Sequence, residues 1–351
     1  MAKIRKLATR NMKLFTSTLL QWFRENGRQL PWRETRDPYA IWLSEVILQQ
    51  TRIQQGTAYW ERFMERWPRV EDLAAATEDE VLRMWQGLGY YSRARNLHAA
   101  ARQIVALGHF PNTLEEIRKL RGVGDYTAAA IASIAFNLPE AVVDGNVYRV
   151  LSRYFGIDTP INTTEGKHTF MALAKELLPA SEASAFNQAM MDFGAIQCTP
   201  QSPRCLLCPL AESCAALREG RVDELPVKLK TLKVKTRHLL YIYIRCQGQT
   251  AIHRRGEGDI WQGLWEPFLI EDAPLPETKG KLRLLRSNVK HVLTHRIILS
   301  DFYLLDCDQH PLLPADYIWI DEPDIENYGV PRLVELLLET VAELDASNRK
   351  K

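Results

Sequence analysis

Four of the six cysteines in this chain lie within seventeen residues, in the pattern C-x6-C-x2-C-x5-C: Cys198, Cys205, Cys208 and Cys214. The short Cys205-Leu-Leu-Cys208 spacing is typical of a metal centre, and four thiolates suit either tetrahedral zinc or an iron–sulfur cluster. Zinc sites usually pair two short knuckles, whereas here one short spacing is flanked by two longer loops. As a metal centre, the pattern therefore favours an iron–sulfur cluster over zinc.

The N-terminus, MAKIRKLATR, is basic, but Lys13 interrupts the apolar run that follows and no small-residue cleavage site appears. We therefore expect no secretory signal and a reducing cytoplasmic environment. Disulfides are rare there, so the cysteine cluster is either a metal centre or four buried or free thiols. Cys246 lies in an apolar, strand-like run and is expected to be a core thiol.

A length of 351 residues predicts two or three domains. Hydrophobic residues at 46% and charged residues at 25% are typical of globular proteins and exclude global disorder. No run approaches the roughly 18 uncharged apolar residues of a membrane span, and the longest candidate, residues 127–139, is too short. We expect a soluble protein that makes no membrane contact.

The net charge is only +2, but the charges are unevenly distributed. Residues 225–256 hold eight Lys or Arg and no Asp or Glu, while residues 321–345 are mostly acidic. The basic tract could contact a polyanion or could be a solvated linker.

The pattern of apolar residues changes near residue 226. Asp37-Pro38 predicts a helix start, and Leu97, Ile104 and other apolar residues recur at helical spacing. Beyond Pro226, β-branched and aromatic runs predict strands at residues 238–245, 250–253, 289–305 and 317–320, followed by a helix at 331–344. We therefore predict a helical domain over 1–226, a basic linker over 227–237, a smaller domain over 238–351, and no internal repeat.

Leu120-Arg-Gly-Val-Gly124 separates two expected helices, at residues 114–119 and 126–136. Two glycines two residues apart permit a tight hairpin whose backbone N–H groups, at the start of the second helix, can receive a phosphate. An ordinary helix–helix turn is the alternative, but the flanking L-x-G-V-G-x-Y-T-A pattern favours a helix-hairpin-helix motif.

Asp144 follows Ala141-Val-Val and precedes an expected helix that begins near Val147. A plain helix N-cap is one interpretation of this residue. The other is a functional anion, because the helix dipole and free N–H groups stabilise a carboxylate at a helix N-terminus.

Glu45 shares a helix face with Ile41, Trp42 and Leu48. Such a carboxyl is desolvated, so its pKa is expected to rise, unless it forms a buried ion pair with Arg33 or Arg52. One protonated and one ionised carboxyl would together provide an acid for the leaving group and an anion for an oxocarbenium ion when a glycosidic bond breaks.

The hairpin, Asp144 and the cysteine loop together resemble the endonuclease III-like superfamily of DNA glycosylases, and within it the MutY-type adenine DNA glycosylases. The resemblance covers nearly the whole chain. It is carried by Leu30-Pro-Trp-Arg33, Ser44-Glu-Val-Ile-Leu-Gln-Gln-Thr51, Gly87-Leu-Gly-Tyr-Tyr-Ser92, the hairpin to Thr127, Val143-Asp-Gly-Asn146 and the cysteine loop. It implies a mainly α N-terminal helix-hairpin-helix glycosylase domain with a 4Fe–4S cluster on the four cysteines, and a smaller α/β Nudix-like C-terminal domain.

The resemblance also implies a mechanism in which a mispaired adenine is flipped out of the duplex. Glu45 would protonate adenine N7, and Asp144 would stabilise the oxocarbenium ion, with Tyr126 and Asn146 as supporting polar groups. Tyr126 stands where bifunctional relatives carry the lysine that forms a Schiff base. We therefore expect a monofunctional enzyme that leaves an abasic site.

Further residues match family positions that contact the substrate. Gln188 is chemically suited to the donor–acceptor edge of adenine. The expected roles are a wedge in the base stack for Gln50 and Tyr90, contact with the opposite base for Thr51 and Leu88, backbone contact for Gly122, Val123 and Gly124, and the adenine pocket for Trp32, Arg33 and Gln188.

The C-terminal half lacks the clustered R-E-x-x-E-E set of a catalytic Nudix domain, so we expect no triphosphate hydrolysis. Leu293-Thr294-His295 stands where many family members read F-S-H, which implies that Thr294 and His295 recognise 8-oxoguanine; purely structural roles in a hairpin are the alternative. The cluster is expected to brace a basic loop that contains Arg204 and faces DNA, because glycosidic hydrolysis moves no electrons.

The implied partner is double-stranded DNA with A·8-oxoguanine or A·G mispairs, bound by a monomer associated with the nucleoid in the cytoplasm. Two alternatives remain open. One is an endonuclease III-like bifunctional lyase, which Tyr126 and the C-terminal domain disfavour. The other is a non-catalytic iron–sulfur protein that binds DNA or transfers electrons.

Overall fold

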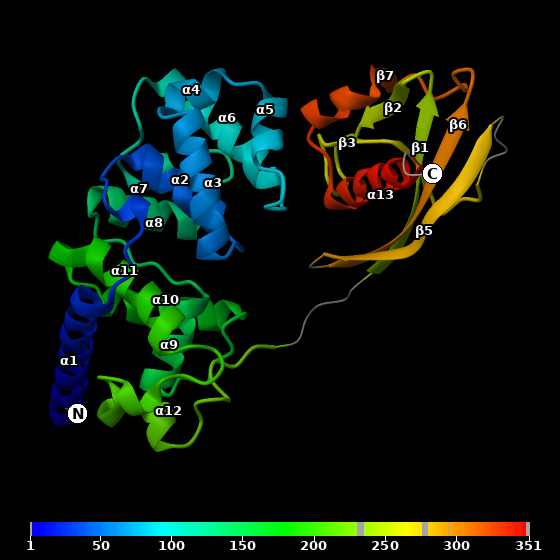
Figure 1. The fold of residues 1–351 in the computed structure, drawn as a ribbon. Coiled ribbons are helices and arrows are strands. Elements are labelled where there is room, and N and C mark those ends of the chain that lie inside the picture. Colours follow the sequence, from blue (N-terminus) through cyan, green and yellow to red (C-terminus); the bar gives the residue numbers. More distant parts are fainter. Residues whose placement is uncertain (1, 230–234, 276–279, 294, 349–351) are drawn as a thin grey trace. The chain divides into compact units, whose positions relative to one another are not determined.

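The computed structural model describes residues 2–229, 235–275, 280–293 and 295–348, and the side chains of all of these except residues 2–10 and Asn348. Its contacts divide the chain into two compact units. The first unit comprises residues 1–74 and 99–230, and the second comprises residues 75–98 and 231–351. Figure 1 shows the elements of both.

The first unit is helical, as the sequence predicts. No helix among the described residues is long and apolar enough to cross a membrane. The helices of this half of the chain are α1 (Ala2–Asn26), α2 (Pro38–Leu48), α3 (Ile53–Arg66), α4 (Val70–Ala75), α5 (Glu78–Met84), α6 (Ser92–Leu107), α7 (Leu114–Ile117), α8 (Asp125–Phe136), α9 (Gly145–Phe155), α10 (Thr164–Leu177), α11 (Ala183–Asp192) and α12 (Ala215–Arg218), with α5 and the start of α6 in the second unit.

Short 3₁₀ and π turns complete this half of the chain. Two 3₁₀ turns, Cys205–Leu207 and Ala211–Ser213, shape the cysteine loop. The others are the 3₁₀ turns Pro31–Arg33 and Ala180–Glu182 and the π turn Phe193–Gln197, which continues α11.

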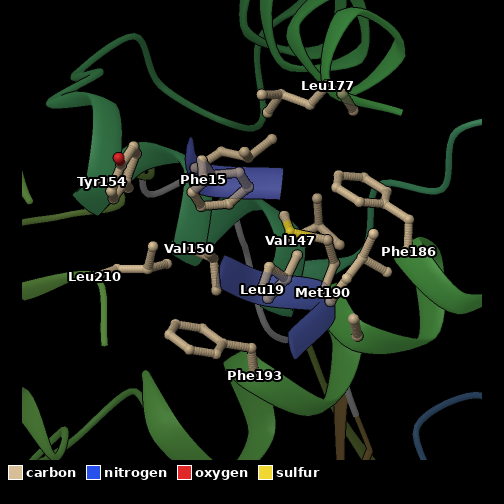
Figure 2. Close-up of a cluster of buried hydrophobic side chains, with 14 of the residues drawn as sticks. Phe15, Leu19, Val147, Val150, Tyr154, Leu177, Phe186, Met190, Phe193 and Leu210 are labelled. Carbon is tan, nitrogen blue, oxygen red and sulfur yellow. The ribbon is translucent and has the colours of Figure 1, made fainter. Parts of the chain in front are cut away.

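A buried apolar core joins α1, α9, α10 and α11 (Figure 2). Phe15 and Leu19 of α1 are fully buried in it beside Val147 and Val150 of α9 and Phe186 of α11. Burying a side chain of this size stabilises a fold by about 1.5–3 kcal/mol. The core therefore fixes α9 and α11 firmly in the first unit, and these two helices hold several of the site residues described below, including Asn146, Arg149 and Gln188.

The helix-hairpin-helix motif forms where the sequence predicts it. α7 ends at Ile117, slightly earlier than expected, and α8 covers the predicted 126–136. Gly122 has φ +75°, a left-handed conformation that favours glycine, and Gly124 is the N-cap of α8. No side chain caps α8 there, so its first turn offers backbone N–H groups to an anion.

The second unit contains a seven-stranded sheet with the order β3-β2-β1-β6-β5, in which β4 also pairs with β1 and β7 with β2. β1 and β6 are parallel, and the other pairs are antiparallel. The strands are β1 (Lys235–Cys246), β2 (Gln249–Arg254), β3 (Trp265–Glu266), β4 (Phe268–Glu271), β5 (Lys281–Val292), β6 (Arg296–Cys307) and β7 (Tyr317–Asp321); a 3₁₀ turn (Glu322–Asn327) and α13 (Arg332–Asn348) follow.

Two details of the second unit differ from the sequence prediction. The single strand predicted at 289–305 is instead the end of β5 and most of β6. The prediction missed the break because Leu293-Thr294-His295 contains no glycine or proline, the residues that most often signal a turn. β1 begins at Lys235, inside the predicted linker, because that residue pairs with Arg296 of β6. Cys246 is buried in the sheet, which confirms the prediction of a core thiol.

Candidate active site

A cavity of about 280 Å³ in the first unit is lined by residues that are far apart in the sequence. Glu45 reaches it from α2, Tyr126 from α8, and Asp144 and Asn146 from the start of α9. The structure thus brings together all four residues that the sequence analysis proposes as catalytic.

Glu45 is positioned by an apolar helix. Asp37 caps α2 by accepting a hydrogen bond from Tyr39 N over 2.9 Å, and Ile41 and Trp42 are fully buried beside Glu45. Burial raises the pKa of Glu45 to about 7, and the charge of Asp144 acts in the same direction, while Arg33 opposes both. The carboxyl can therefore hold a proton near neutral pH.

Asp144 is the N-cap of α9, and both of its carboxylate oxygens accept hydrogen bonds. Val147 N donates to Oδ1 over 2.8 Å, and Asn146 Nδ2 donates to Oδ2 over 2.8 Å. Donors of this kind at a helix N-terminus stabilise negative charge. Asp144 is thus a helix cap and also presents a fixed anion to the cavity.

The charges of Glu45 and Asp144 both act on the Tyr126 hydroxyl. Burial raises the pKa of Tyr126 well above its ordinary value, and Glu45 and Asp144 raise it further. Its hydroxyl is therefore neutral at all ordinary pH values and donates to Met191 Sδ at 3.6 Å.

Arg33 pairs with Asp192 and not with Glu45. Arg33 Nη1 donates to Asp192 Oδ2 over 2.8 Å and Nη2 to Oδ1 over 3.0 Å, while Arg28 Nε also donates to Oδ1 over 2.8 Å. Burial raises the pKa of Asp192, but the hydrogen bonds from the two arginines outweigh it and the pKa is lowered. Sequence analysis missed Asp192, whose only signal is an acid among the apolar residues of α11.

The three residues proposed for the adenine pocket, Trp32, Arg33 and Gln188, all line the cavity. Trp32 is buried and packs edge-on against Trp60, with 5.9 Å between ring centroids. Gln188 Nε2 donates to Ser184 Oγ and O on the preceding turn of α11, at 3.1 and 3.3 Å.

The residues proposed to contact DNA have distinct backbone features. Thr51 lines the cavity, and Gln50 beside it is exposed with φ +56°. Tyr90, in the second unit, is also exposed and has φ +46°. Positive φ is uncommon for residues other than glycine and often marks functional positions. Leu88 is buried in that unit. In the hairpin, Gly122 and Gly124 are exposed and Val123 is buried.

Of the two residues proposed for lesion recognition, Thr294 lies outside the described residues. His295 is exposed and lines a cavity of about 670 Å³ in the second unit, together with Trp261, His291 and Leu293. Burial lowers the pKa of His291, so its ring is predominantly neutral near pH 7.

The four clustered cysteines all line one small cavity of the first unit. Arg153, which is buried, donates to Cys198 Sγ over 3.4 Å and to Thr199 O over 2.7 Å, and so fixes the start of the loop. Burial raises the pKa of the Cys208 thiol to about 11. Among the described residues, no three His, Cys, Asp or Glu side chains are grouped as a single metal ion requires. Four soft sulfur donors around a cavity fit an iron–sulfur cluster.

Arg149, also missed by sequence analysis, connects the cysteine loop to Asp144. It is buried on α9; Nε donates to Cys198 O over 2.7 Å, and Nη2 donates to Asn146 Oδ1 over 2.8 Å and to Gly194 O over 2.6 Å. Asn146 in turn bonds Asp144. Nothing in the sequence distinguishes Arg149 from a surface arginine on an amphipathic helix.

Three family models match the chain. Residues 43–179 match the HhH-GPD superfamily of base excision DNA repair proteins, 198–214 match the iron–sulfur binding domain of endonuclease III, and 240–340 match a NUDIX domain. The adenine DNA glycosylase of Buchnera aphidicola (Schizaphis graminum) is 34% identical over 342 residues, which cover 93% of this chain and 98% of that protein. The chain belongs to the adenine DNA glycosylase family.

This membership makes the protein an enzyme of base excision repair, a hydrolase that acts on N-glycosyl bonds. The mouse adenine DNA glycosylase is 44% identical over 226 residues, covering 60% of this chain and 44% of the longer mouse protein. A solved structure of a thermostable thymine-DNA glycosylase superposes with a TM-score of 0.56 at 32% identity, over 60% of this chain and 99% of that one. The iron–sulfur match confirms the 4Fe–4S assignment, and Cys198, Cys205, Cys208 and Cys214 all lie in the matched segment.

Proposed function

We propose that this protein is a monofunctional glycosylase that hydrolyses the N-glycosidic bond of adenine opposite 8-oxoguanine or guanine in duplex DNA and leaves an abasic site. The observation that carries the proposal is the position of Glu45 and Asp144, which line one cavity: burial raises the pKa of Glu45, and Asp144 accepts hydrogen bonds at a helix N-terminus.

Glu45 supplies the acid. Adenine leaves poorly as an anion, and protonation at N7 makes it a better leaving group. A carboxyl with a pKa of about 7 holds a proton at neutral pH and can also release it, which is what a general acid requires. The flipped base enters the cavity, where the stacked duplex no longer shields its glycosidic bond.

Asp144 supplies the anion. As the bond breaks, positive charge develops on the sugar, and a carboxylate held by Val147 N and Asn146 Nδ2 stabilises that charge without having to reorganise. Water then attacks the oxocarbenium ion, and an abasic sugar remains.

Tyr126 supports a monofunctional reaction. It lines the cavity where bifunctional relatives carry a lysine, and a phenol cannot form a Schiff base with the opened sugar. Its raised pKa keeps the hydroxyl protonated, so it acts as a hydrogen-bond donor beside the two carboxyls.

The base opposite the adenine would be read by other parts of the chain. We propose that Gln50 and Tyr90 enter the base stack, that Thr51 and Leu88 lie beside the opposite base, and that Thr294 and His295 recognise 8-oxoguanine. The exposed hairpin glycines would bind the DNA backbone through N–H groups. The protein would act as a monomer on chromosomal DNA in the cytoplasm.

The bound 4Fe–4S cluster would cross-link the four cysteines and so brace their loop. Arg204, which is exposed on that loop, would then face the DNA phosphates, and Arg149 and Arg153 would tie the braced segment to α9.

The test is a glycosylase assay on A·8-oxoguanine, A·G and A·T duplexes measured side by side. We expect adenine release from the first two, with strand cleavage only after alkali. Strand cleavage without alkali, together with trapping by borohydride, would instead identify a bifunctional lyase. Equal release from A·T would contradict the proposed mispair specificity.

A further inference from the structure

A second cavity, of about 370 Å³, lies against the first in the same unit. We call it the rear cavity; it is bounded by Phe23, Arg36, Asn137, Ser181 and Ala185. The two cavities share four lining residues, Trp32, Arg33, Ile134 and Gln188. Neither Glu45 nor Asp144 lines the rear cavity, and we call the four shared side chains the wall between the two cavities.

The members of this wall differ in how firmly they are held. Arg33 is clamped by two hydrogen bonds to the buried Asp192, and Trp32 is buried against Trp60. Among the described residues, the Gln188 side chain hydrogen-bonds only to Ser184, one turn earlier on its own helix, and none of them donates to its Oε1. A rotation of the Gln188 side chain breaks only these local bonds, so Gln188 is the movable part of the wall.

The rear cavity also opens to solvent. Arg36 and Ser181 on its rim are exposed, while Trp32 at its inner end is buried. Its lining combines aromatic rings with amide, hydroxyl and guanidinium groups and the carboxylate of Glu182. Phe23 lies under the Arg33 guanidinium at 5.4 Å, and Asn137 donates to Ser181 O and accepts from Ser184 N. A planar, neutral heterocycle with hydrogen-bonding edges suits such a lining.

Cleavage creates such a molecule in the neighbouring cavity. The flipped nucleotide enters from the duplex, and after the bond breaks the abasic sugar still belongs to the DNA strand that covers the entrance. The free base is then separated from solvent by DNA on one side and by the wall containing Gln188 on the other.

We propose that the rear cavity receives the free purine base after cleavage and is its route to solvent while the abasic DNA stays bound. This inference rests on the proposed glycosylase function. Gln188 acts as the gate, and the rear cavity is a transient site for adenine distinct from the site of the reaction.

The experiment follows three events in one single-turnover reaction with an A·8-oxoguanine duplex that carries labelled adenine. Alkaline cleavage measures bond breakage, rapid ultrafiltration measures adenine that has left the protein–DNA complex, and a competitor trap measures dissociation of the abasic DNA. We expect wild-type protein to release adenine in a burst that precedes DNA dissociation.

Filling the rear cavity should abolish this burst. Of the two cavities, Ala185 lines the rear one and not the one with Glu45, so Ala185→Phe is expected to leave bond breakage unchanged while adenine leaves no faster than the DNA. Ser181→Trp at the exposed rim tests the same route without altering the buried part of α11. Ala99→Phe, at an exposed position of α6 away from the cavity lining, is the matched control and should keep the burst.

The outcomes separate this inference from the proposed function. If wild-type protein cleaves the bond but adenine leaves only together with the DNA, the rear route is wrong and the glycosylase stands. A burst that persists in both Ala185→Phe and Ser181→Trp, each folded and active, would also overturn the route. Failure to cleave the duplex at all would overturn the proposed function, and the route with it.

Discussion

Arg149 donates a hydrogen bond to Asn146 Oδ1 over 2.8 Å, and this contact fixes which way the Asn146 amide faces. A guanidinium has only donors, so the oxygen of Asn146 must point to Arg149 and its NH2 group to Asp144. The same guanidinium binds Cys198 O at the start of the cysteine loop. The orientation of the candidate anion therefore depends on a residue that also touches the iron–sulfur segment.

We expect Arg149→Met to slow adenine excision and to destabilise the protein. The substitution leaves the buried carbonyl of Gly194 without this donor, at a cost of about 1–3 kcal/mol, removes the donor to the half-buried carbonyl of Cys198, and frees the Asn146 amide to turn. Denaturant unfolding and single-turnover rates are the measurements. Arg149→Lys should not restore the rate, because an ammonium cannot span these acceptors as a guanidinium fork does. The exposed Arg62→Met on α3 is the control, and an unchanged rate in Arg149→Met would contradict the role.

The pH dependence of excision should report the protonation of Glu45. Because burial and Asp144 raise its pKa to about 7, the acid is protonated below that value and loses its proton above it. We expect the single-turnover rate to fall as pH rises through about 7, towards tenfold per pH unit well above it. A rate that stays flat from pH 6 to pH 9 would exclude Glu45 as the acid.

Glu45→Gln should abolish base release yet stabilise the fold at alkaline pH. The folded-state pKa lies above the ordinary value of 4.5, so the native protein binds more protons than the unfolded chain between these two values. The free energy of unfolding therefore falls as pH rises from about 4.5 to about 7 and stays low above that. Since glutamine does not titrate, the variant should be more stable at pH 8 by up to about 3 kcal/mol. Urea unfolding at pH 5 and pH 8 measures this, with the exposed Glu34→Gln as the control.

Asp192→Asn should shift the pH profile of excision to lower pH. Asp192 neutralises Arg33, and Arg33 lowers the pKa of Glu45, so removing the Asp192 charge strengthens that effect. Breaking a buried pair also costs about 3–5 kcal/mol of stability. The measurements are the midpoint of the pH–rate profile and thermal unfolding. Asp72→Asn, which breaks an exposed pair with Arg69, should move neither by much, and a profile unchanged in Asp192→Asn would refute the coupling.

Cys208→Ser should lose the brown colour of the cluster. Thiolate-ligated iron–sulfur clusters absorb near roughly 400 nm, and serine cannot replace a soft sulfur ligand. The measurement is the visible spectrum together with the iron content of purified protein. Cys246→Ser, within the sheet of the second unit, should keep both. A Cys208→Ser protein with full iron content would remove Cys208 from the ligand set.

Local sequence signals predicted much of the fold. Asp37-Pro38 begins α2, Asp144 caps α9, and two glycines form the hairpin before α8, because capping and positive φ depend on residues adjacent in sequence. The prediction of one continuous strand over 289–305 was wrong, because the chain breaks there between β5 and β6. A turn without glycine or proline leaves no local signal in the sequence.

By itself, the sequence determined the chemistry available: an acid on an apolar helix face, an acid at a helix N-terminus and four clustered thiols. Only the tertiary structure decided that Glu45 and Asp144 line one cavity, and that Asp192 rather than Glu45 pairs with Arg33. Contacts between residues distant in the chain depend on how helices pack, and packing is fixed by the whole buried core of α1, α9, α10 and α11. No short stretch of sequence encodes that arrangement.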